Sequence, residues 1–244
     1  MKTLRWNIVI PAFFCLFGVS SVEAAKYSVL EGGVENGGTV SGRITYDGTP
    51  PAVKMLKVDE DTEACGEDRP SEELLVNSSG GIKNVVLSIE DIESGKQWTL
   101  PEEFVYDQKK CTFVPRILLI KPKAPGVVLN SDDVGHNFHT ISKGILNINK
   151  KMKAGAKVKV KEKKIRKSGI IRAKCDIHSW MKGWWFVAKT PYSVLSNENG
   201  EFSIADIPPG TYTLKLWHEV LGEREQTVVV KANESAEINV TLEF

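Results

Sequence analysis

Short runs of β-branched and aromatic residues, separated by turn-forming residues, recur along this chain and limit what it can fold into. No long stretch places apolar residues at helical spacing. Glycine-containing turns separate many of the runs. The runs occupy residues 40–46, 84–89, 116–120, 127–129, 145–148, 157–160, 169–173, 184–187, 211–217 and 236–242. This pattern is typical of β-sandwiches and barrels, so we expect an all-β fold.

Length and composition limit the number and type of domains. A chain of 244 residues is long enough for one large or two modest β-domains, each with its own core. The hydrophobic content of 41% and the charged content of 26% are ordinary for a globular protein. The formal net charge of +1 gives no general attraction to nucleic acid or to a membrane surface, and neither is expected as a partner.

The first residues have the pattern of a secretory signal peptide. Basic residues precede an apolar stretch over residues 8–19, and Ala24-Ala25 follow it. The apolar stretch is shorter than the roughly 20 residues that a bilayer span needs, which favours a signal peptide over a membrane anchor. We therefore assign residues 1–25 to the signal peptide and expect the protein to be periplasmic or secreted.

Removal of that segment leaves Cys65, Cys111 and Cys175. An odd number of cysteines in an exported protein leaves one thiol free or in an intermolecular bond. The simplest partition is a disulfide between Cys65 and Cys111, formed in an oxidising compartment, with Cys175 kept for another purpose.

Positive charge is concentrated in one segment. Residues 150–174 are almost wholly basic, and Glu162 is the only carboxylate among them. One interpretation is that these basic residues form the solvent-exposed face of an edge strand, where their charges discourage pairing with another chain. The other is a docking surface for an acidic partner, where charge raises the rate of association. The two interpretations are compatible.

The region around Cys175 carries the clearest chemical signal. Cys175, His178 and Met181 have the spacing Cys-x2-His-x2-Met after a strand-like run, and His136 follows an earlier run. A thiolate, two imidazoles and a thioether suit copper that cycles between Cu(I) and Cu(II), because soft sulfur favours Cu(I) and imidazole accepts both states. Three ligands on one short loop converge on one ion only if the fourth comes from a neighbouring strand end.

At these motifs the chain resembles the plastocyanin family of cupredoxins, and most closely the amicyanins. The resemblance spans about residues 80–190 and implies a Greek-key β-sandwich with one type 1 copper ion. It also implies that Asn137 holds the two ligand loops together, and Gly135 departs from the proline that relatives usually have there. The copper ligands that it implies are His136, Cys175, His178 and Met181.

Two other histidines need separate consideration. His139 follows His136 by three residues on the same strand, so strand alternation places it on the opposite face. A tetrahedral zinc site formed by His136, His139, Cys175 and His178 is nevertheless a rival. His218 is expected to be a partly buried strand histidine bonded to a neighbour, with a place at the mouth of the metal site as the alternative.

The C-terminal segment, residues 191–244, resembles a second family. Residues 197–202 and 208–212 follow the pattern of the carboxypeptidase regulatory-like family, a transthyretin-like β-sandwich, and residues 38–44 resemble its opening strand. We therefore expect the N-terminal segment, residues 26–79, to pack with this smaller β-module. The cupredoxin domain would then be inserted between the two segments.

Together these features predict an exported blue-copper electron-transfer protein. It is not expected to be an enzyme, because it lacks the common catalytic motifs and a saturated copper site leaves no open position. A dehydrogenase or cytochrome partner would dock at the loop of His178, expected to be exposed, or at residues 150–174. Similar two-part proteins are associated with methylamine utilisation.

Other roles remain open at this point. Trp180 lies between two predicted ligands, so it would shield the copper or lie on an electron path. The first alternative function is a non-redox adhesion module with a vestigial or zinc-filled site. The second is a copper storage or delivery protein.

Overall fold

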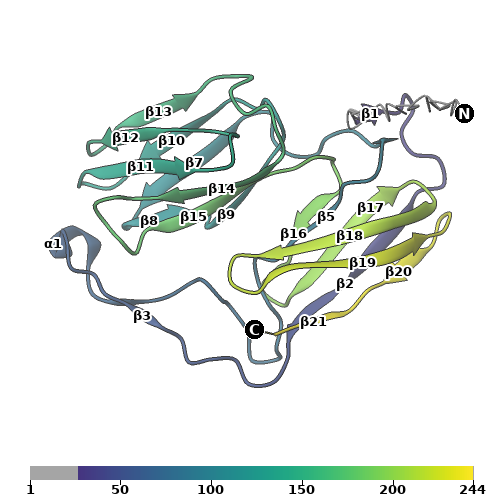
Figure 1. The fold of residues 1–244 in the computed structure, drawn as a ribbon, viewed down its shortest axis with the longest axis horizontal. Coiled ribbons are helices and arrows are strands. Elements are labelled where there is room, and N and C mark those ends of the chain that lie inside the picture. Colours follow the sequence, from purple (N-terminus) through teal and green to yellow (C-terminus); the bar gives the residue numbers. More distant parts are fainter. Residues whose placement is uncertain (1–26, 244) are drawn as a thin grey trace, which may run out of the picture.

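The computed structural model describes residues 27–243, so the predicted signal peptide lies outside the described residues. Within this range the chain is built from β-strands and one short helix, α1 (Thr62–Cys65), which confirms the predicted all-β fold (Figure 1). The described part contains no helix long and apolar enough to cross a membrane.

Two sheets face each other in the first sandwich (Figure 1). One has the order β13-β10-β7-β8 and the other the order β12-β11-β14-β15-β9. The parallel pairs β10–β7 and β15–β9 join strands that are not successive in the chain. The strands are β7 (Phe104–Lys109), β8 (Thr112–Val114), β9 (Ile117–Ile120), β10 (Gly126–Asn130), β11 (His136–Ile141), β12 (Asn149–Met152), β13 (Lys157–Val160), β14 (Gly169–Lys174) and β15 (Lys182–Val187).

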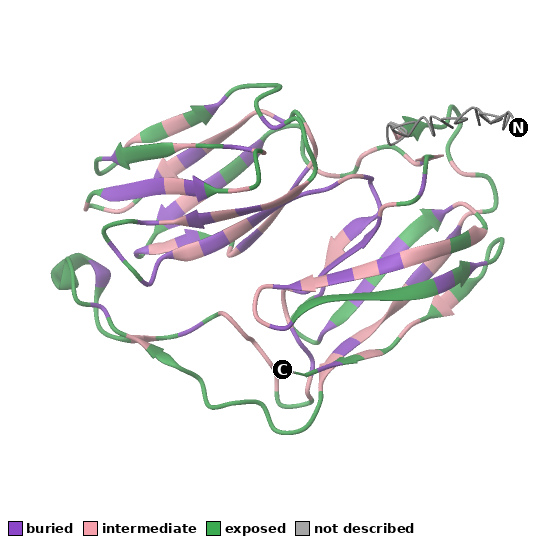
Figure 2. Cartoon of the chain, in the orientation of Figure 1, coloured by how far each residue is buried: buried purple, intermediate pink, exposed green. Residues whose placement is uncertain are grey.

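Aromatic side chains fill the interior of this sandwich. Tyr106 stacks on Phe113 with ring centroids 5.3 Å apart, and Phe138 lies 5.6 Å from Trp185. All four residues are buried. Figure 2 shows buried positions along the strands of this sandwich. Residues two apart on a strand share a face, so burial of Phe138 also turns His136 inward. The aromatic core thus fixes the strand that carries the first predicted ligand.

The second sandwich combines segments from both ends of the described chain. One sheet has the order β16-β5-β18-β19, and the other has the order β17-β2-β20 with β21 also paired to β2. A two-stranded parallel pair, β1 (Ser28–Val29) with β6 (Ser94–Gly95), stands apart from these sheets. The strands of the sandwich are β2 (Gly38–Tyr46), β5 (Val86–Ile89), β16 (Ser193–Leu195), β17 (Glu201–Ile207), β18 (Gly210–His218), β19 (Gly222–Val230), β20 (Ser235–Glu237) and β21 (Val240–Leu242).

The pairing of strand β5 does not fit a domain boundary at residue 80, which the sequence led us to expect. Strand β5 falls in the range 80–190 assigned to the cupredoxin domain, yet it pairs with β16 and β18. All four of its residues are buried, because β5 occupies an inner position of that sheet. A boundary at residue 80 would therefore assign β2 and β5, two strands of one sandwich, to different domains.

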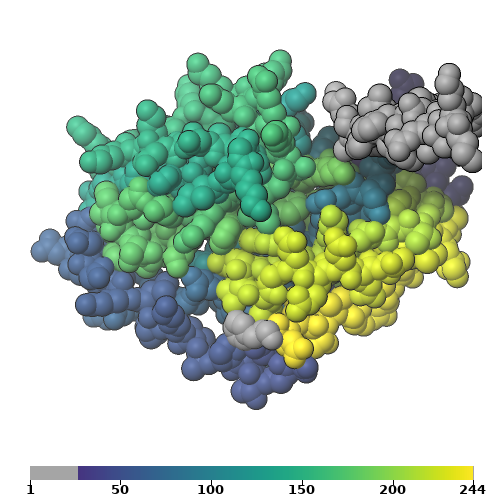
Figure 3. All heavy atoms as spheres, viewed as in Figure 1, coloured from purple at the N-terminus to yellow at the C-terminus, as the bar shows by residue number. Residues whose placement is uncertain are grey.

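A long segment leaves the second sandwich after β2 and reaches the far end of the first (Figure 1). We call residues 49–75 the strap; it contains β3 (Met55–Leu56), α1 and β4 (Arg69–Pro70). Its atoms pack along the lower edge of the molecule in Figure 3. The predicted disulfide is present: Cys65 in the strap is bonded to Cys111 between β7 and β8.

A buried ion pair joins the two sandwiches. Arg116, just before β9, donates through Nε and Nη2 to the two carboxylate oxygens of Glu219 at 2.5 and 2.7 Å. The indole N–H of Trp184 donates to the same carboxylate at 2.9 Å. The side chains of Arg116 and Glu219 are only 9% and 6% exposed, so solvent screens this contact weakly.

His218 lies beside this ion pair, in the second sandwich. Its Nδ1 accepts hydrogen bonds from the backbone N–H groups of Val220 and Leu221 at 3.3 and 3.2 Å. Burial lowers the pKa of His218 to about 4, and the charge of Arg116 acts in the same direction. A strand histidine hydrogen-bonded to a neighbour is the role expected from the sequence, although His218 is fully rather than partly buried, at 2% exposed.

This arrangement predicts a pH-dependent stability that depends on His218. The folded pKa of about 4 lies below the ordinary value of 6.5, so His218 stabilises the fold fully above pH 6.5. That contribution is lost as pH falls toward 4, and it amounts to roughly 3 kcal/mol. Between pH 7 and 4, the metal-free native chain should lose about that much more unfolding free energy than His218→Asn in urea titrations. Parallel curves for the two proteins would contradict the assignment.

Candidate metal centre

Three predicted ligands meet at the strap-covered end of the first sandwich. His136 begins β11, and Cys175 and His178 lie in the loop between β14 and β15. Nδ1 of His136 lies 2.9 Å from Nδ1 of His178, and Sγ of Cys175 lies 3.6 Å from the latter nitrogen. The three residues are only 1%, 4% and 0% exposed in the order His136, Cys175, His178. The structure therefore assembles one sulfur and two ring nitrogens in a buried group.

Each ligand histidine is held from its outer side by a carboxylate. Nε2 of His136 donates to Oδ2 of Asp132 at 2.8 Å, and Nε2 of His178 donates to Oδ2 of Asp61 at 3.0 Å. A carboxylate only accepts hydrogen bonds, so each neutral ring carries its proton on Nε2 and presents a lone pair at Nδ1. Burial lowers the pKa of His136, opposed only in part by Asp132, and so favours the neutral, metal-binding ring.

The donor set and its spacing fit a copper ion. Two lone pairs that face each other across 2.9 Å repel unless a cation lies between them. Ligand atoms about 2.0–2.3 Å from one metal ion lie roughly 3–4 Å apart, which is the spacing of these nitrogens and this sulfur. Imidazole and thiolate are also donors that copper prefers. His136, Cys175 and His178 are thus arranged to hold one such ion.

Met181 closes the loop that carries Cys175 and His178. Its backbone N–H donates to the carbonyl of His178 at 3.0 Å, and its carbonyl accepts from the N–H of Cys175 at 3.2 Å. The Met181 residue is 1% exposed. These bonds fold the Cys-x2-His-x2-Met segment into a tight turn, which keeps Met181 in the same buried loop as Cys175 and His178.

Asn137 connects the two segments that supply the ligands. Its backbone N–H donates to Sγ of Cys175 at 3.2 Å, and its side-chain oxygen accepts from the N–H of Asp176 at 3.3 Å. A second backbone N–H, that of His178, lies 3.4 Å from the same sulfur. Two donors directed at Sγ stabilise negative charge on it, which is the form that binds metals.

Sequence reasoning missed both carboxylates. Asp132 accepts a hydrogen bond from the backbone N–H of Cys111 at 2.8 Å, which fixes its carboxylate. Because Asp132 precedes His136 by only four residues, its closeness in sequence could have indicated this contact. Asp61 is 117 residues from His178 in the chain. No local pattern links two positions that far apart, and only the fold of the strap brings them together.

His178 is not the exposed residue that the sequence led us to expect. It is 0% exposed, because Asp61 of the strap binds its Nε2 and Sγ of Cys65 lies 4.0 Å from the same atom. The expectation that the His178 side chain itself is exposed is therefore wrong. The exposed residues of the loop are its neighbours Asp176, Ile177 and Ser179.

His139 points away from the three ligands, as strand alternation predicts. Its Nδ1 contacts Oδ2 of Asp176 at 3.0 Å, and its side chain is 26% exposed. The structure thus does not assemble the four-residue zinc set of the rival hypothesis.

Trp180 covers the site from the strap side. Its ring centroid lies 5.0 Å from that of His178, and its indole N–H donates to the carbonyl of Cys111 at 3.0 Å. The side chain is buried, so it helps to exclude water from the ligand loop.

Comparison with known protein families gives one match. A model of the carboxypeptidase regulatory-like domain matches residues 186–243, which contain strands β16 to β21 of the second sandwich. No match was found among curated proteins.

Several solved structures are similar to part of this chain, and copper proteins are among them. Amicyanin from Paracoccus versutus is 19% identical, with a TM-score of 0.31, covering 36% of this chain and 85% of amicyanin. A purple cupredoxin from Nitrosopumilus maritimus is 19% identical, with a TM-score of 0.29 and coverages of 34% and 98%. A copper-containing nitrite reductase from Thermus scotoductus SA-01 is 20% identical, with a TM-score of 0.32 and coverages of 41% and 25%.

Proposed function

We propose that this protein binds one type 1 copper ion and carries single electrons between redox partners. The ligands would be His136, Cys175 and His178, with Met181 as a weaker fourth. The observation that carries the proposal is the pair of facing Nδ1 atoms, 2.9 Å apart and each backed by a carboxylate, beside a buried thiol. When bound, copper supplies a one-electron couple, Cu(II)/Cu(I).

In this function the protein fixes the positions of the ligand side chains. Asp132 and Asp61 fix the two imidazole rings, and Asn137 ties the loop of Cys175 to β11. Outer hydrogen bonds of this kind orient metal-binding histidines and raise their basicity. Ligands fixed by bonds on both sides rearrange little when the charge at the site changes, which favours rapid electron transfer.

Burial of the ligands supports a carrier rather than an enzyme. The side chains of His136, Cys175 and His178 are at most 4% exposed, and the strap lies over the rings. A substrate would have to displace the strap to reach them. An electron needs no such opening, so this arrangement suits exchange with a protein partner at the surface.

The partner in this proposal is an acidic redox protein outside the cytoplasm. The Cys65–Cys111 disulfide is of a kind that persists in oxidising compartments, consistent with a periplasmic or secreted protein. Two surfaces are candidates for docking this partner: the exposed neighbours of His178 in its loop, and the basic segment 150–174. Its lysines at 150, 151, 157 and 159 are exposed on β12 and β13.

Addition of Cu(II) to the mature protein is expected to produce an intense absorption band near roughly 600 nm, from thiolate-to-copper charge transfer. Cys175→Ser should abolish the band because it removes the only free thiol among residues 27–243. His139→Asn is the matched control and should keep the band, because His139 lies outside the ligand group. A colourless native protein, or a band that survives Cys175→Ser, would exclude the proposed site.

Asp61→Asn is expected to raise the reduction potential of the copper-loaded protein. The neutral amide no longer strengthens His178 as a donor, so Cu(II) loses more stability than Cu(I). A tenfold change in the ratio of the Cu(II) and Cu(I) binding constants shifts the reduction potential by about 60 mV, which voltammetry resolves easily. Asp59→Asn removes the same charge from the strap without touching the His178 bond, and it should leave the potential nearly unchanged. Equal shifts in the two variants would contradict a role for the hydrogen bond.

A further inference from the structure

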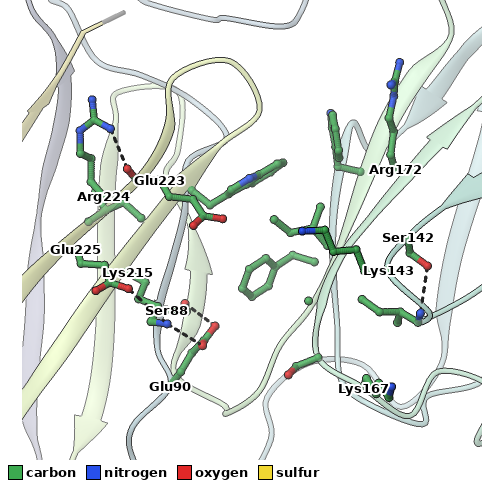
Figure 4. Close-up of a pocket in the computed structure, with 18 of the residues that line it drawn as sticks. Ser88, Glu90, Ser142, Lys143, Lys167, Arg172, Lys215, Glu223, Arg224 and Glu225 are labelled. Atoms are coloured by element: carbon green, nitrogen blue, oxygen red, sulfur yellow. Dashed lines mark hydrogen bonds and ion pairs between the residues drawn. The ribbon is translucent and has the colours of Figure 1, made fainter.

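A cleft of about 690 Å³ lies between the two sandwiches, away from the candidate metal centre (Figure 4). Strands β14 and β15 form one side, and β5, β18 and β19 form the other. Three aromatic residues line it: Trp184, Phe186 and Trp217. Trp184 and Trp217 are half-buried, with ring centroids 5.4 Å apart. Clefts of this size with aromatic linings, placed between domains, are common ligand sites.

The wall contributed by the first sandwich carries only positive charge. Lys143, Lys167 and Arg172 line this side, and Figure 4 shows them opposite the acidic residues of the other side. Among the ion pairs of the described residues, none includes Lys143 or Lys167. Unpaired cations beside an apolar surface favour a ligand with a negative charge.

Arg172 provides the most specific indication of such a ligand. The centre of its guanidinium lies 5.8 Å from the ring centroid of Trp184, a cation–π arrangement. Its Nε is buried and has no hydrogen-bond partner among residues 27–243. A buried donor without a partner is unfavourable, and an anionic oxygen is an acceptor that would remove this cost.

The opposite wall offers acceptors. Glu90, Glu223 and Glu225 line it together with Arg224 and Lys215, and Lys215 lies 3.4 Å from Glu90 and 3.5 Å from Glu225. Carboxylates accept hydrogen bonds from hydroxyl groups. A ligand that uses the whole cleft therefore has hydroxyl groups on one side, negative charge on the other and an apolar face for the indole rings.

We propose that this cleft binds an acidic saccharide, a sugar chain that carries carboxylate groups. The planes of the two indoles are inclined by 67°, so the C–H faces of successive sugar rings cover Trp184 and Trp217. A carboxylate of the saccharide meets Arg172, and its hydroxyls meet the glutamates. An aromatic acid would satisfy Arg172 and the indoles but would leave the acidic wall without donors. This function is separate from electron transfer and does not depend on copper.

The test is calorimetric titration of the full mature, copper-treated protein with tetragalacturonate. We expect saturable binding at one site, and binding at least tenfold weaker for a neutral glucose tetramer. Arg172→Gln should weaken the binding of tetragalacturonate at least tenfold. Arg166→Gln removes the same charge from an exposed position outside the cleft and should leave binding unchanged.

A second variant protects the test against a folding defect in Arg172→Gln. Lys143→Gln with Lys167→Gln changes only exposed side chains and should also weaken binding, with an unchanged near-ultraviolet circular dichroism spectrum. The proposal is overturned if tetragalacturonate does not bind, if the neutral tetramer binds equally well, or if Arg166→Gln weakens binding as much as Arg172→Gln. Competition by benzoate that displaces the saccharide completely would instead indicate an aromatic acid as the ligand.

Discussion

The Cys65–Cys111 disulfide is the constraint on which the candidate metal centre depends. It fastens the strap to the turn between β7 and β8, and so places Asp61 against His178. At the same turn, the backbone N–H of Cys111 holds Asp132, the residue that binds His136. One covalent bond therefore supports both carboxylates that orient the two imidazole rings. The ligand geometry is set by segments far from the ligands in sequence.

The second sandwich supplies the strap that covers His178. The strap leaves it after β2 and returns to it at β5, so the cover over His178 is an extension of the neighbouring sandwich. The buried Arg116–Glu219 pair and the indole of Trp184 fix the two sandwiches against each other. The same contact leaves the aromatic cleft open beside it. The relative orientation of the sandwiches and the cleft between them are thus consequences of one interface.

Local sequence patterns predicted what local geometry determines. Strand periodicity indicated the all-β fold, and the spacing of Cys175 and His178 placed both on one loop. Alternation along β11 correctly separated His139 from His136, because neighbouring residues of a strand face opposite ways. Long-range contacts could not be predicted in this way. Neither the hydrogen bond between Asp61 and His178 nor the burial of His178 is indicated by the residues near it in sequence. The pairing of β5 with β18 was missed for the same reason.

X-ray absorption at the copper edge, in both oxidation states, tests the central claim most directly. The claim is that Cys175 and the two carboxylate-backed histidines hold copper in one fixed geometry. We expect one sulfur ligand and two nitrogen ligands in the oxidised protein, and the same three in the reduced protein, because Asp61 and Asp132 keep both rings in place. A spectrum without the sulfur ligand, or loss of a nitrogen ligand on reduction, would contradict the account.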